Sequence, residues 1–239
     1  MVVIREPTSE EISKLYDGLF HTGGYDAHRL EFERLKAGRA VRDTYRRHIL
    51  KRLEGSHPGR RLVEIGGGTG AFGVMARSRG WQYTDWDISD VAVNCARALS
   101  LDAQRFDAGS APPLSRNSAD VIVMWEVIEH LWKVREYLEV IREALVPGGV
   151  FVASTPNLRR TEYLESLTHG PSLSAPPLHV NFFTADSLAN AVQSVGFARV
   201  EIVQRRFHRP QPTLRSLVNT LSIAVGRSEA KSLYCWAWR

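Results

Sequence analysis

Residues 61–73 read R-L-V-E-I-G-G-G-T-G-A-F-G, and this stretch decides the fold class. Its first residues form a short apolar run, as expected of a strand buried in a parallel sheet. Glycines follow at once, and they let the backbone turn sharply and approach a ligand closely because no Cβ stands in the way. The small and apolar residues 71–76 then favour a helix that packs on the sheet. Strand, glycine loop and helix in this order predict the start of a nucleotide-binding βαβ unit.

Two ligand classes fit the glycine loop. Residues 66–71 satisfy the G-x-G-x-x-G/A dinucleotide pattern, and Asp87 lies about 20 residues further on, where a ribose-binding acid is expected. The same loop also reads acid-x-Gly-x-Gly-x-Gly, through Glu64, Gly66, Gly68 and Gly70. The spacing therefore predicts a bound ligand and leaves its class open at this point.

Length and composition narrow the class of protein. A chain of 239 residues, 44% hydrophobic and 24% charged, suits one globular α/β domain with additions. No apolar run approaches the roughly 18 residues that span a bilayer, and the N-terminus does not read as a signal peptide. Cys95 and Cys235 lack C-x-x-C spacing, so neither a disulfide framework nor a thiolate zinc site is indicated. We therefore expect a cytoplasmic enzyme.

The net charge of +5 comes mostly from arginines that are spread along the chain. A nucleic-acid footprint usually forms a denser stripe, often interleaved with aromatic residues. Scattered solvation charge is the favoured interpretation.

Periodicity predicts the remaining elements. Hydroxyl caps and helical spacing indicate one helix from residue 8, another over residues 27–53 that Gly38 weakens in its middle, and others that follow Ser89 and Thr184. A further helix is expected at residues 214–225. Besides the strand that precedes the glycine loop, alternating or apolar runs predict six strands, at residues 81–89, 102–106, 119–125, 150–153, 198–203 and 232–238. We expect residues 1–59 to form an N-terminal helical extension and residues 60–239 to form the ligand-binding domain.

The run W-E-V-I-E-H-L at residues 125–131 is the most informative polar cluster. Together with V-P-G-G-V-F-V at residues 146–152 and S-T-P-N at residues 154–157, it strongly resembles the Rossmann-like S-adenosylmethionine-dependent methyltransferases. The resemblance covers residues 61–202 and disfavours the dinucleotide interpretation. It implies an α/β fold with a seven-stranded, mostly parallel sheet, helices on both faces and the last strand inserted antiparallel between the fifth and sixth. It also implies S-adenosylmethionine as cofactor, with S-adenosylhomocysteine as product.

The resemblance assigns cofactor contacts residue by residue. Glu64 organises the loop, and Asp87 binds the ribose hydroxyls. Ile88 packs beside the adenine, and Asp107 accepts a hydrogen bond from the adenine amino group. Asp85 competes with Asp87, because it lies two residues earlier on the same face of the strand. The full set of expected cofactor-binding residues is Glu64, Gly66, Gly67, Gly68, Gly70, Asp87, Ile88, Asp107, Ala108 and Trp125.

Methyl transfer is an in-line displacement, so the protein must mainly position the nucleophile and, for an oxygen, remove its proton. Candidate catalytic residues at the correct sheet end are Glu126, His130 and His179. Glu126, Glu129 and His130 would share one face if this segment began a helix. With His179, they form an oxygen and nitrogen set able to hold a divalent cation.

The arrangement E-x-x-E-H looks like that of the ubiquinone-biosynthesis O-methyltransferases. With a later histidine, it also resembles the small-RNA 2′-O-methyltransferases, where such residues hold a metal. Metal binding, a metal-free histidine base and a structural role all stay open.

We predict a methyltransferase that acts on an oxygen of a small-molecule biosynthetic intermediate. The alternatives are an RNA 2′-O-methyltransferase and a cofactor-binding regulatory protein without turnover. Residues 1–59 and 158–177 are expected to select the substrate, and the sequence leaves the oligomeric state open.

Overall fold

The structure of the chain is a computed structural model, and it describes residues 5–21, 26–39, 43–56, 58–160, 178–205 and 230–239. The predicted helix at residues 214–225 and most of the segment 158–177 lie outside these residues. No helix among the described residues is long and apolar enough to cross a membrane.

A seven-stranded sheet forms the centre of the molecule, in the order β3-β2-β1-β4-β5-β7-β6. Its strands are β1 (Arg61–Ile65), β2 (Gln82–Asp87), β3 (Asp102–Arg105), β4 (Ala119–Trp125), β5 (Leu145–Pro156), β6 (Arg199–Arg205) and β7 (Ser232–Trp238). Only β7 runs antiparallel to its neighbours, between β5 and β6. The strand order and the antiparallel insertion confirm the predicted fold class.

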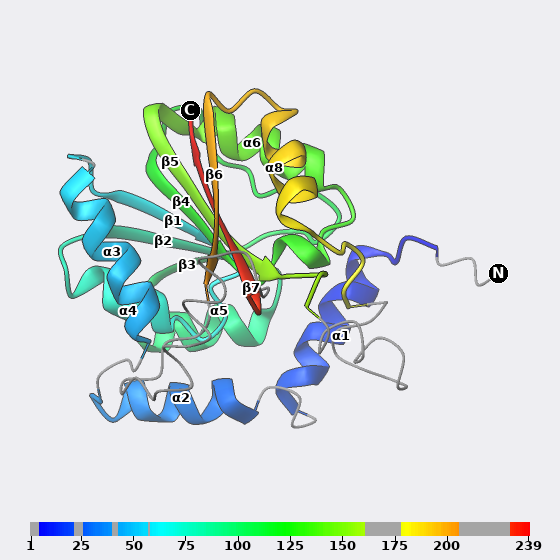
Figure 1. The fold of residues 1–239 in the computed structure, drawn as a ribbon. Coiled ribbons are helices and arrows are strands. Elements are labelled where there is room, and N and C mark those ends of the chain that lie inside the picture. Colours follow the sequence, from blue (N-terminus) through cyan, green and yellow to red (C-terminus); the bar gives the residue numbers. More distant parts are fainter. Residues whose placement is uncertain (1–4, 22–25, 40–42, 57, 161–177, 206–229) are drawn as a thin grey trace, which may run out of the picture.

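Helices cover both faces of the sheet. Figure 1 shows α3 (Thr44–Ser56) and α4 (Ala71–Arg77) on one side, and α6 (Val134–Ala144) and α8 (Ala185–Gln193) on the other. Each face of the sheet has its own hydrophobic core, and alternate residues of β4 contribute to one or the other. Val121, Val123 and Trp125 pack with α3 and α4. Ile122 and Met124 pack with α6 and α8 on the opposite face. Every residue of β4 is buried, which explains why this strand is the most apolar run of the sequence.

The predicted helix caps are present. Ser89 accepts the Ala92 N–H and begins α5 (Asp90–Ala98), and Thr184 forms a capping box with Ser187 at the start of α8. In the segment 126–131, however, the structure differs from a continuous helix. Glu126 has a φ of 55°, a single 3-10 turn spans Ile128–His130, and α6 starts only at Val134. Glu126, Glu129 and His130 therefore do not share the face of an α-helix.

The N-terminal helices are α1 (Ser9–His21), α2 (Asp26–Lys36) and α3. The single helix expected at residues 27–53 is divided, and Gly38, with a φ of 70°, lies in the interruption. Ile49, Leu50 and Leu53 of α3 are buried in the core of the sheet. Because α3 already belongs to this core, the domain boundary at residue 59 stays a prediction.

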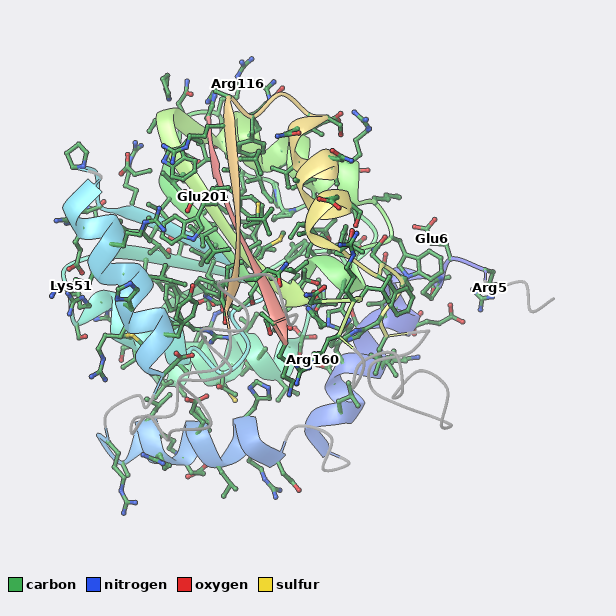
Figure 2. The ribbon with its side chains drawn as sticks, in the orientation of Figure 1. Arg5, Glu6, Lys51, Arg116, Arg160 and Glu201 are labelled. Carbon is green, nitrogen blue, oxygen red and sulfur yellow. The ribbon has the colours of Figure 1, made fainter. Side chains whose placement is uncertain are left out.

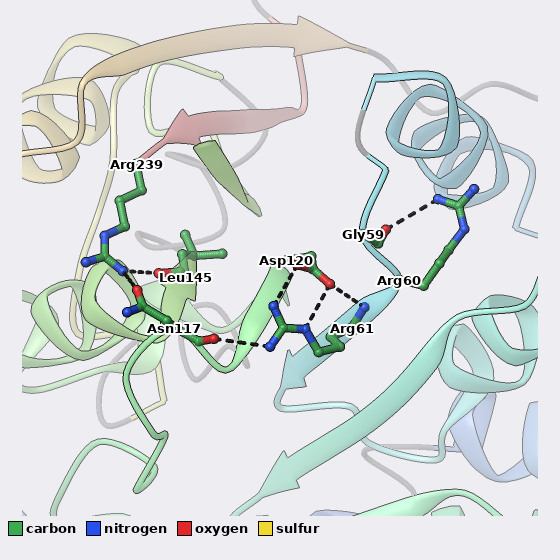
Figure 3. A network of polar contacts seen from close by, with 7 residues as sticks. All are labelled: Gly59, Arg60, Arg61, Asn117, Asp120, Leu145 and Arg239. Atoms are coloured by element: carbon green, nitrogen blue, oxygen red, sulfur yellow. Dashed lines mark hydrogen bonds and ion pairs between the residues drawn. The ribbon is translucent and has the colours of Figure 1, made fainter. Parts of the chain in front are cut away.

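An ion pair joins the amino ends of two central strands (Figure 3). The Asp120 carboxylate on β4 accepts hydrogen bonds from the backbone N–H, Nε and Nη2 of Arg61 on β1, at 2.8, 3.1 and 2.9 Å. Asp120 is only 6% exposed. This network fixes the register of β1 on β4 at the sheet end opposite the glycine loop.

Three exposed cations of the described residues lie far from one another. Arg5, Lys51 and Arg116 are exposed and lie on widely separated parts of the molecule (Figure 2). These three cations therefore do not form a common patch, and the scattered solvation charge of the whole chain stays a prediction.

Candidate active site

The glycine loop, residues 66–70, leaves β1 where the strand order reverses between β1 and β4. Such a switch point opens a crevice beyond the carboxyl ends of the strands. Gly66 and Gly68 have φ of 78° and 58°, and both line a cavity of about 340 Å³. A Cβ on Gly68 would meet no atom within 4 Å and would project into this space. Glycine at this position therefore keeps room for a ligand.

Asp87 ends β2 in the wall of the cavity. Its Oδ2 accepts the Gly68 N–H and its Oδ1 accepts the Ser89 N–H, each at 2.9 Å. Burial raises the pKa of Asp87, and these backbone hydrogen bonds oppose the rise. Ile88 lines the cavity beside it, whereas Asp85 is fully buried and accepts the Gly67 N–H at 3.0 Å. Of the two competing acids, Asp87 is therefore the one that faces the cavity.

Glu64 is buried within the core and is not part of the cavity wall. It accepts a hydrogen bond from the Tyr83 hydroxyl. Burial raises the pKa of Glu64 to about 7, although the positive charge of Arg46 opposes the shift. Gly70 begins α4 with a φ of 83°, and a Cβ there would lie 2.6 Å from Leu101. Neither Glu64 nor Gly70 lines the cavity, and their contact with the cofactor stays a prediction.

The chain after β3 contributes Phe106, Ala108 and Gly109 to the cavity wall. The Asp107 carboxylate is exposed instead, and it accepts the Gly109 N–H at 2.9 Å. This bond, followed by one with Ser9, lowers the pKa of Asp107. The structure thus gives Asp107 a role in shaping the turn, and its contact with adenine stays a prediction.

Trp125 closes the cavity at the end of β4. The Arg46 guanidinium of α3 lies over its ring, with Cζ 5.2 Å from the ring centroid, and Phe72 packs edge-on at 5.2 Å. Arg46 also lines the cavity, with Nε 3.4 Å from Asp43 Oδ2. No local signal in the chain identifies Arg46 as a site residue, because its place depends on how α3 packs against the sheet.

Glu126 is held in its left-handed conformation by Ser154 on the neighbouring strand. The Ser154 hydroxyl donates to Glu126 Oε1 at 2.7 Å, and the Glu126 N–H donates to the Ser154 carbonyl at 3.0 Å. Burial raises the pKa of Glu126, while the Ser154 hydrogen bond and the charge of Arg46 oppose it. A glutamate in this conformation persists only when its surroundings over-determine it, and such residues concentrate at functional sites.

Glu129, His130 and His179 form a compact cluster, in which one ligand atom of each lies within 4.8 Å of the others. The two imidazoles meet edge-on at 4.6 Å between ring centroids. Glu129 is buried, and neither of its carboxylate oxygens has a hydrogen-bond partner among the described residues. Glu126, which was expected with them as a fourth ligand, is bound to Ser154 instead.

Both histidines are neutral near pH 7. Burial lowers the pKa of His130, and burial followed by electrostatic repulsion from the protonated form of His130 lowers the pKa of His179 to about 4. His130 Nδ1 lies 2.8 Å from the Leu178 carbonyl oxygen, so Nδ1 carries the proton and Nε2 keeps a lone pair. Burial and the charge of Glu126 raise the pKa of Glu129 well above its usual range. The cluster thus offers imidazole lone pairs able to accept a proton or bind a cation.

Helix α1 supplies an apolar wall that the sequence did not identify residue by residue. Ile12, Tyr16 and Leu19 follow one another at helical spacing and line the cavity, and the Tyr16 ring meets His130 edge-on at 5.8 Å. The Asp17 carboxylate accepts a hydrogen bond from the Ser89 hydroxyl at 2.5 Å, which anchors α1 to the start of α5. Helix α1 thus forms part of the cavity wall, and the role of residues 1–59 in selecting the substrate stays a prediction.

Residues 37–202 match a family model described as a methyltransferase domain. A probable S-adenosylmethionine-dependent methyltransferase of Mycolicibacterium smegmatis is 32% identical over 170 residues, which cover 69% of this chain and 62% of that protein. The chain thus spans somewhat less than two thirds of that relative's length.

Two further proteins are similar to the chain. A ubiquinone biosynthesis O-methyltransferase of Burkholderia thailandensis is 26% identical over 163 residues, covering 63% of this chain and 70% of the relative. The crystal structure of a possible histamine N-methyltransferase from Thermotoga maritima superposes with a TM-score of 0.65 at 18% identity, covering 93% of this chain and 97% of that one. At 18% identity, the similarity to the Thermotoga maritima structure shows a shared fold alone.

Proposed function

We propose that this chain, which belongs to the S-adenosylmethionine-dependent methyltransferases, transfers the methyl group to an oxygen atom of a small-molecule biosynthetic intermediate. One observation carries the proposal. The glycine loop and Asp87 share a single cavity with two neutral histidines, His130 and His179. The cofactor side and a proton-accepting side of the site thus face the same space.

The residues of the loop side fit S-adenosylmethionine, which supplies an electrophilic methyl group when bound. Gly66 and Gly68 leave the wall free of side chains, and Asp87 offers carboxylate oxygens suited to vicinal hydroxyls. Ile88, Ala108 and the remaining loop residues would surround the rest of the cofactor.

The opposite side suits an acceptor hydroxyl. An oxygen nucleophile must lose its proton as the new bond forms, and a neutral imidazole accepts that proton. His130 is oriented for this task, because Leu178 fixes its Nδ1 and leaves Nε2 unprotonated. Ile12 and Leu19 of α1 favour an acceptor with an apolar body. The similarity to a ubiquinone biosynthesis O-methyltransferase supports the same acceptor class.

A second candidate function is RNA 2′-O-methylation at a metal site. The cluster of Glu129, His130 and His179 favours it, because two imidazole nitrogens and an unsatisfied buried carboxylate are a donor set that suits a divalent cation. Such a cation would lower the pKa of an acceptor hydroxyl. Glu126 would join this set only after leaving Ser154.

Label transfer from methyl-labelled S-adenosylmethionine tests both functions. The purified chain is incubated with a metabolite-rich extract or with total small RNA, each with and without a chelator. Label in the organic-soluble fraction supports the small-molecule acceptor, and loss of that label with the chelator would identify the cluster as a metal site. Label that stays with RNA and disappears on nuclease treatment would favour the second function.

The same substitution at two different histidines provides the test and its matched control. His130→Gln removes the proposed base and is expected to lower transfer about 100-fold or more, the usual contribution of general base catalysis. His48→Gln changes an exposed histidine of α3 and should transfer like the wild type. Equal activity of both variants would remove His130 from the chemistry.

A further inference from the structure

Asp85 is a buried acid that the proposed chemistry does not use. It is 0% exposed, and its Oδ1 accepts the Gly67 N–H at 3.0 Å. Its Oδ2 is buried as well and has no hydrogen-bond partner among the described residues. Burying a carboxyl group while one of its oxygens lacks a hydrogen-bond partner is unfavourable, so Asp85 is placed here at a cost to stability.

The backbone of Gly67 lies directly against the Asp85 carboxyl group. A Cβ on Gly67 would lie 2.4 Å from Asp85 Oδ1, and the three nearest atoms all belong to the Asp85 carboxyl group. The φ of Gly67 lies outside the left-handed region, unlike those of Gly66 and Gly68. Gly67 is therefore a glycine because of the space that Asp85 occupies, whereas its neighbours are glycines because of their backbone.

The two contacts turn the middle of the loop away from the cavity. Gly67 donates to Asp85, while Gly66 and Gly68 on either side of it line the cavity. The next N–H, that of Gly68, is held by Asp87 on the same face of β2. Two acids of one strand thus fix two successive amides of the loop before any ligand binds.

We propose that Asp85 and Gly67 form a matched pair that presets the glycine loop, which makes Asp85 a positioning residue for cofactor binding. The proposal rests on the proposed function only in taking this loop as the S-adenosylmethionine site. A loop that is already ordered saves the ligand the entropic cost of ordering it. Loss of the pair should therefore weaken cofactor affinity without removing a group that touches the cofactor.

The protonation state of Asp85 determines which substitution preserves its hydrogen bond to Gly67. Burial, with the nearby charges of Asp87 and Glu64, raises the pKa of Asp85 well above its usual range. An uncharged carboxyl group has nearly the shape and polarity of a carboxamide. Asp85→Asn should therefore keep the acceptor for the Gly67 N–H, whereas Asp85→Ala removes it.

The first test measures binding of S-adenosylhomocysteine by isothermal titration calorimetry, with thermal unfolding as the check on folding. We expect Asp85→Ala to raise Kd about tenfold or more, which is about 1.4 kcal/mol, and Asp85→Asn to stay within about threefold of wild type. Thr84→Ala is the matched control, because Thr84 lies on the same strand and its hydroxyl donates to Asp102 away from the cavity. It should bind like the wild type.

The second test asks whether Gly67 depends on Asp85. Gly67→Ala alone should raise Kd about tenfold or more, because its methyl group meets the Asp85 carboxyl group. In the double variant Gly67→Ala/Asp85→Ala that obstacle is gone, so its Kd should stay within about threefold of Asp85→Ala alone. Such non-additivity is the signature of two residues in contact.

The outcomes separate the pair from the proposed function. Unchanged Kd in Asp85→Ala, or additive losses in the double variant, would overturn the matched pair while the proposed function stands. Equal weakening in Asp85→Asn and Asp85→Ala would also overturn it, since the retained acceptor should rescue binding. A wild-type chain that binds no S-adenosylhomocysteine would overturn both.

Discussion

His179 should make the protein less stable as the pH falls. Its pKa in the folded chain is lowered to about 4, first by burial and then by the charge of His130, against an ordinary value of 6.5. Between these two values the unfolded chain binds a proton that the folded chain does not, so the free energy of unfolding decreases as the pH falls through this window. At 1.36 kcal/mol per pH unit, the loss contributed by His179 reaches roughly 3 kcal/mol near pH 4.

Urea denaturation at pH 7.5 and pH 4.5, with a chelator present, measures this loss. Over this interval the free energy of unfolding of wild type should fall by roughly 2–3 kcal/mol more than that of His179→Gln, which has no proton to bind. His48→Gln, at an exposed site, should fall as the wild type does. The buried carboxyl groups also change the free energy of unfolding with pH, but wild type and both variants share them, so their contribution cancels in the comparison. Equal decreases in wild type and His179→Gln would refute the argument that burial keeps this imidazole neutral.

Three further substitutions test the site and its frame. Asp87→Asn should raise the Kd of S-adenosylhomocysteine roughly tenfold to 100-fold, measured by calorimetry, because a hydrogen bond to a charged group contributes about 1.5–3 kcal/mol. Ser154→Ala should free the Glu126 carboxylate, while the backbone hydrogen bond to the Ser154 carbonyl remains, and should lower the rate of label transfer about tenfold with little change in that Kd. A parallel loss of affinity would contradict a role confined to the transfer step. Asp120→Ala should lower the free energy of unfolding by roughly 2–4 kcal/mol in urea, since Arg61 loses both carboxylate oxygens as acceptors and keeps the Asn117 carbonyl, and leave the Kd unchanged.

The sheet was predictable because its strands are marked by local signals. Residues 119–125 form an uninterrupted apolar run, and the structure begins and ends β4 at these residues. The glycine spacing at residues 66–70 and the hydroxyl caps at Ser89 and Thr184 also depend only on neighbours in the chain. The antiparallel place of β7 came from the resemblance, since alternation in a strand does not reveal its direction.

The site was less predictable where its geometry depends on distant parts of the chain. The spacing of Glu126, Glu129 and His130 is also that of a helix, and nothing local indicates that Glu126 takes a φ of 55°. That conformation depends on Ser154, which lies 28 residues away. Arg46 reaches the cavity because α3 packs on the sheet, so its role appears only in the folded chain.

The acids around the glycine loop suit a ligand that carries a positive charge. Burial raises the pKa of Glu64 to about 7 and raises those of Asp87 and Glu126. A positive charge nearby favours the ionised form of each, as Arg46 already does for Glu64 and Glu126, whereas a neutral ligand adds no further relief of the cost of burying that form. S-adenosylmethionine is a sulfonium cation and S-adenosylhomocysteine is a neutral thioether. We therefore expect these acids to distinguish donor from spent product by charge, which favours release of the product after each transfer.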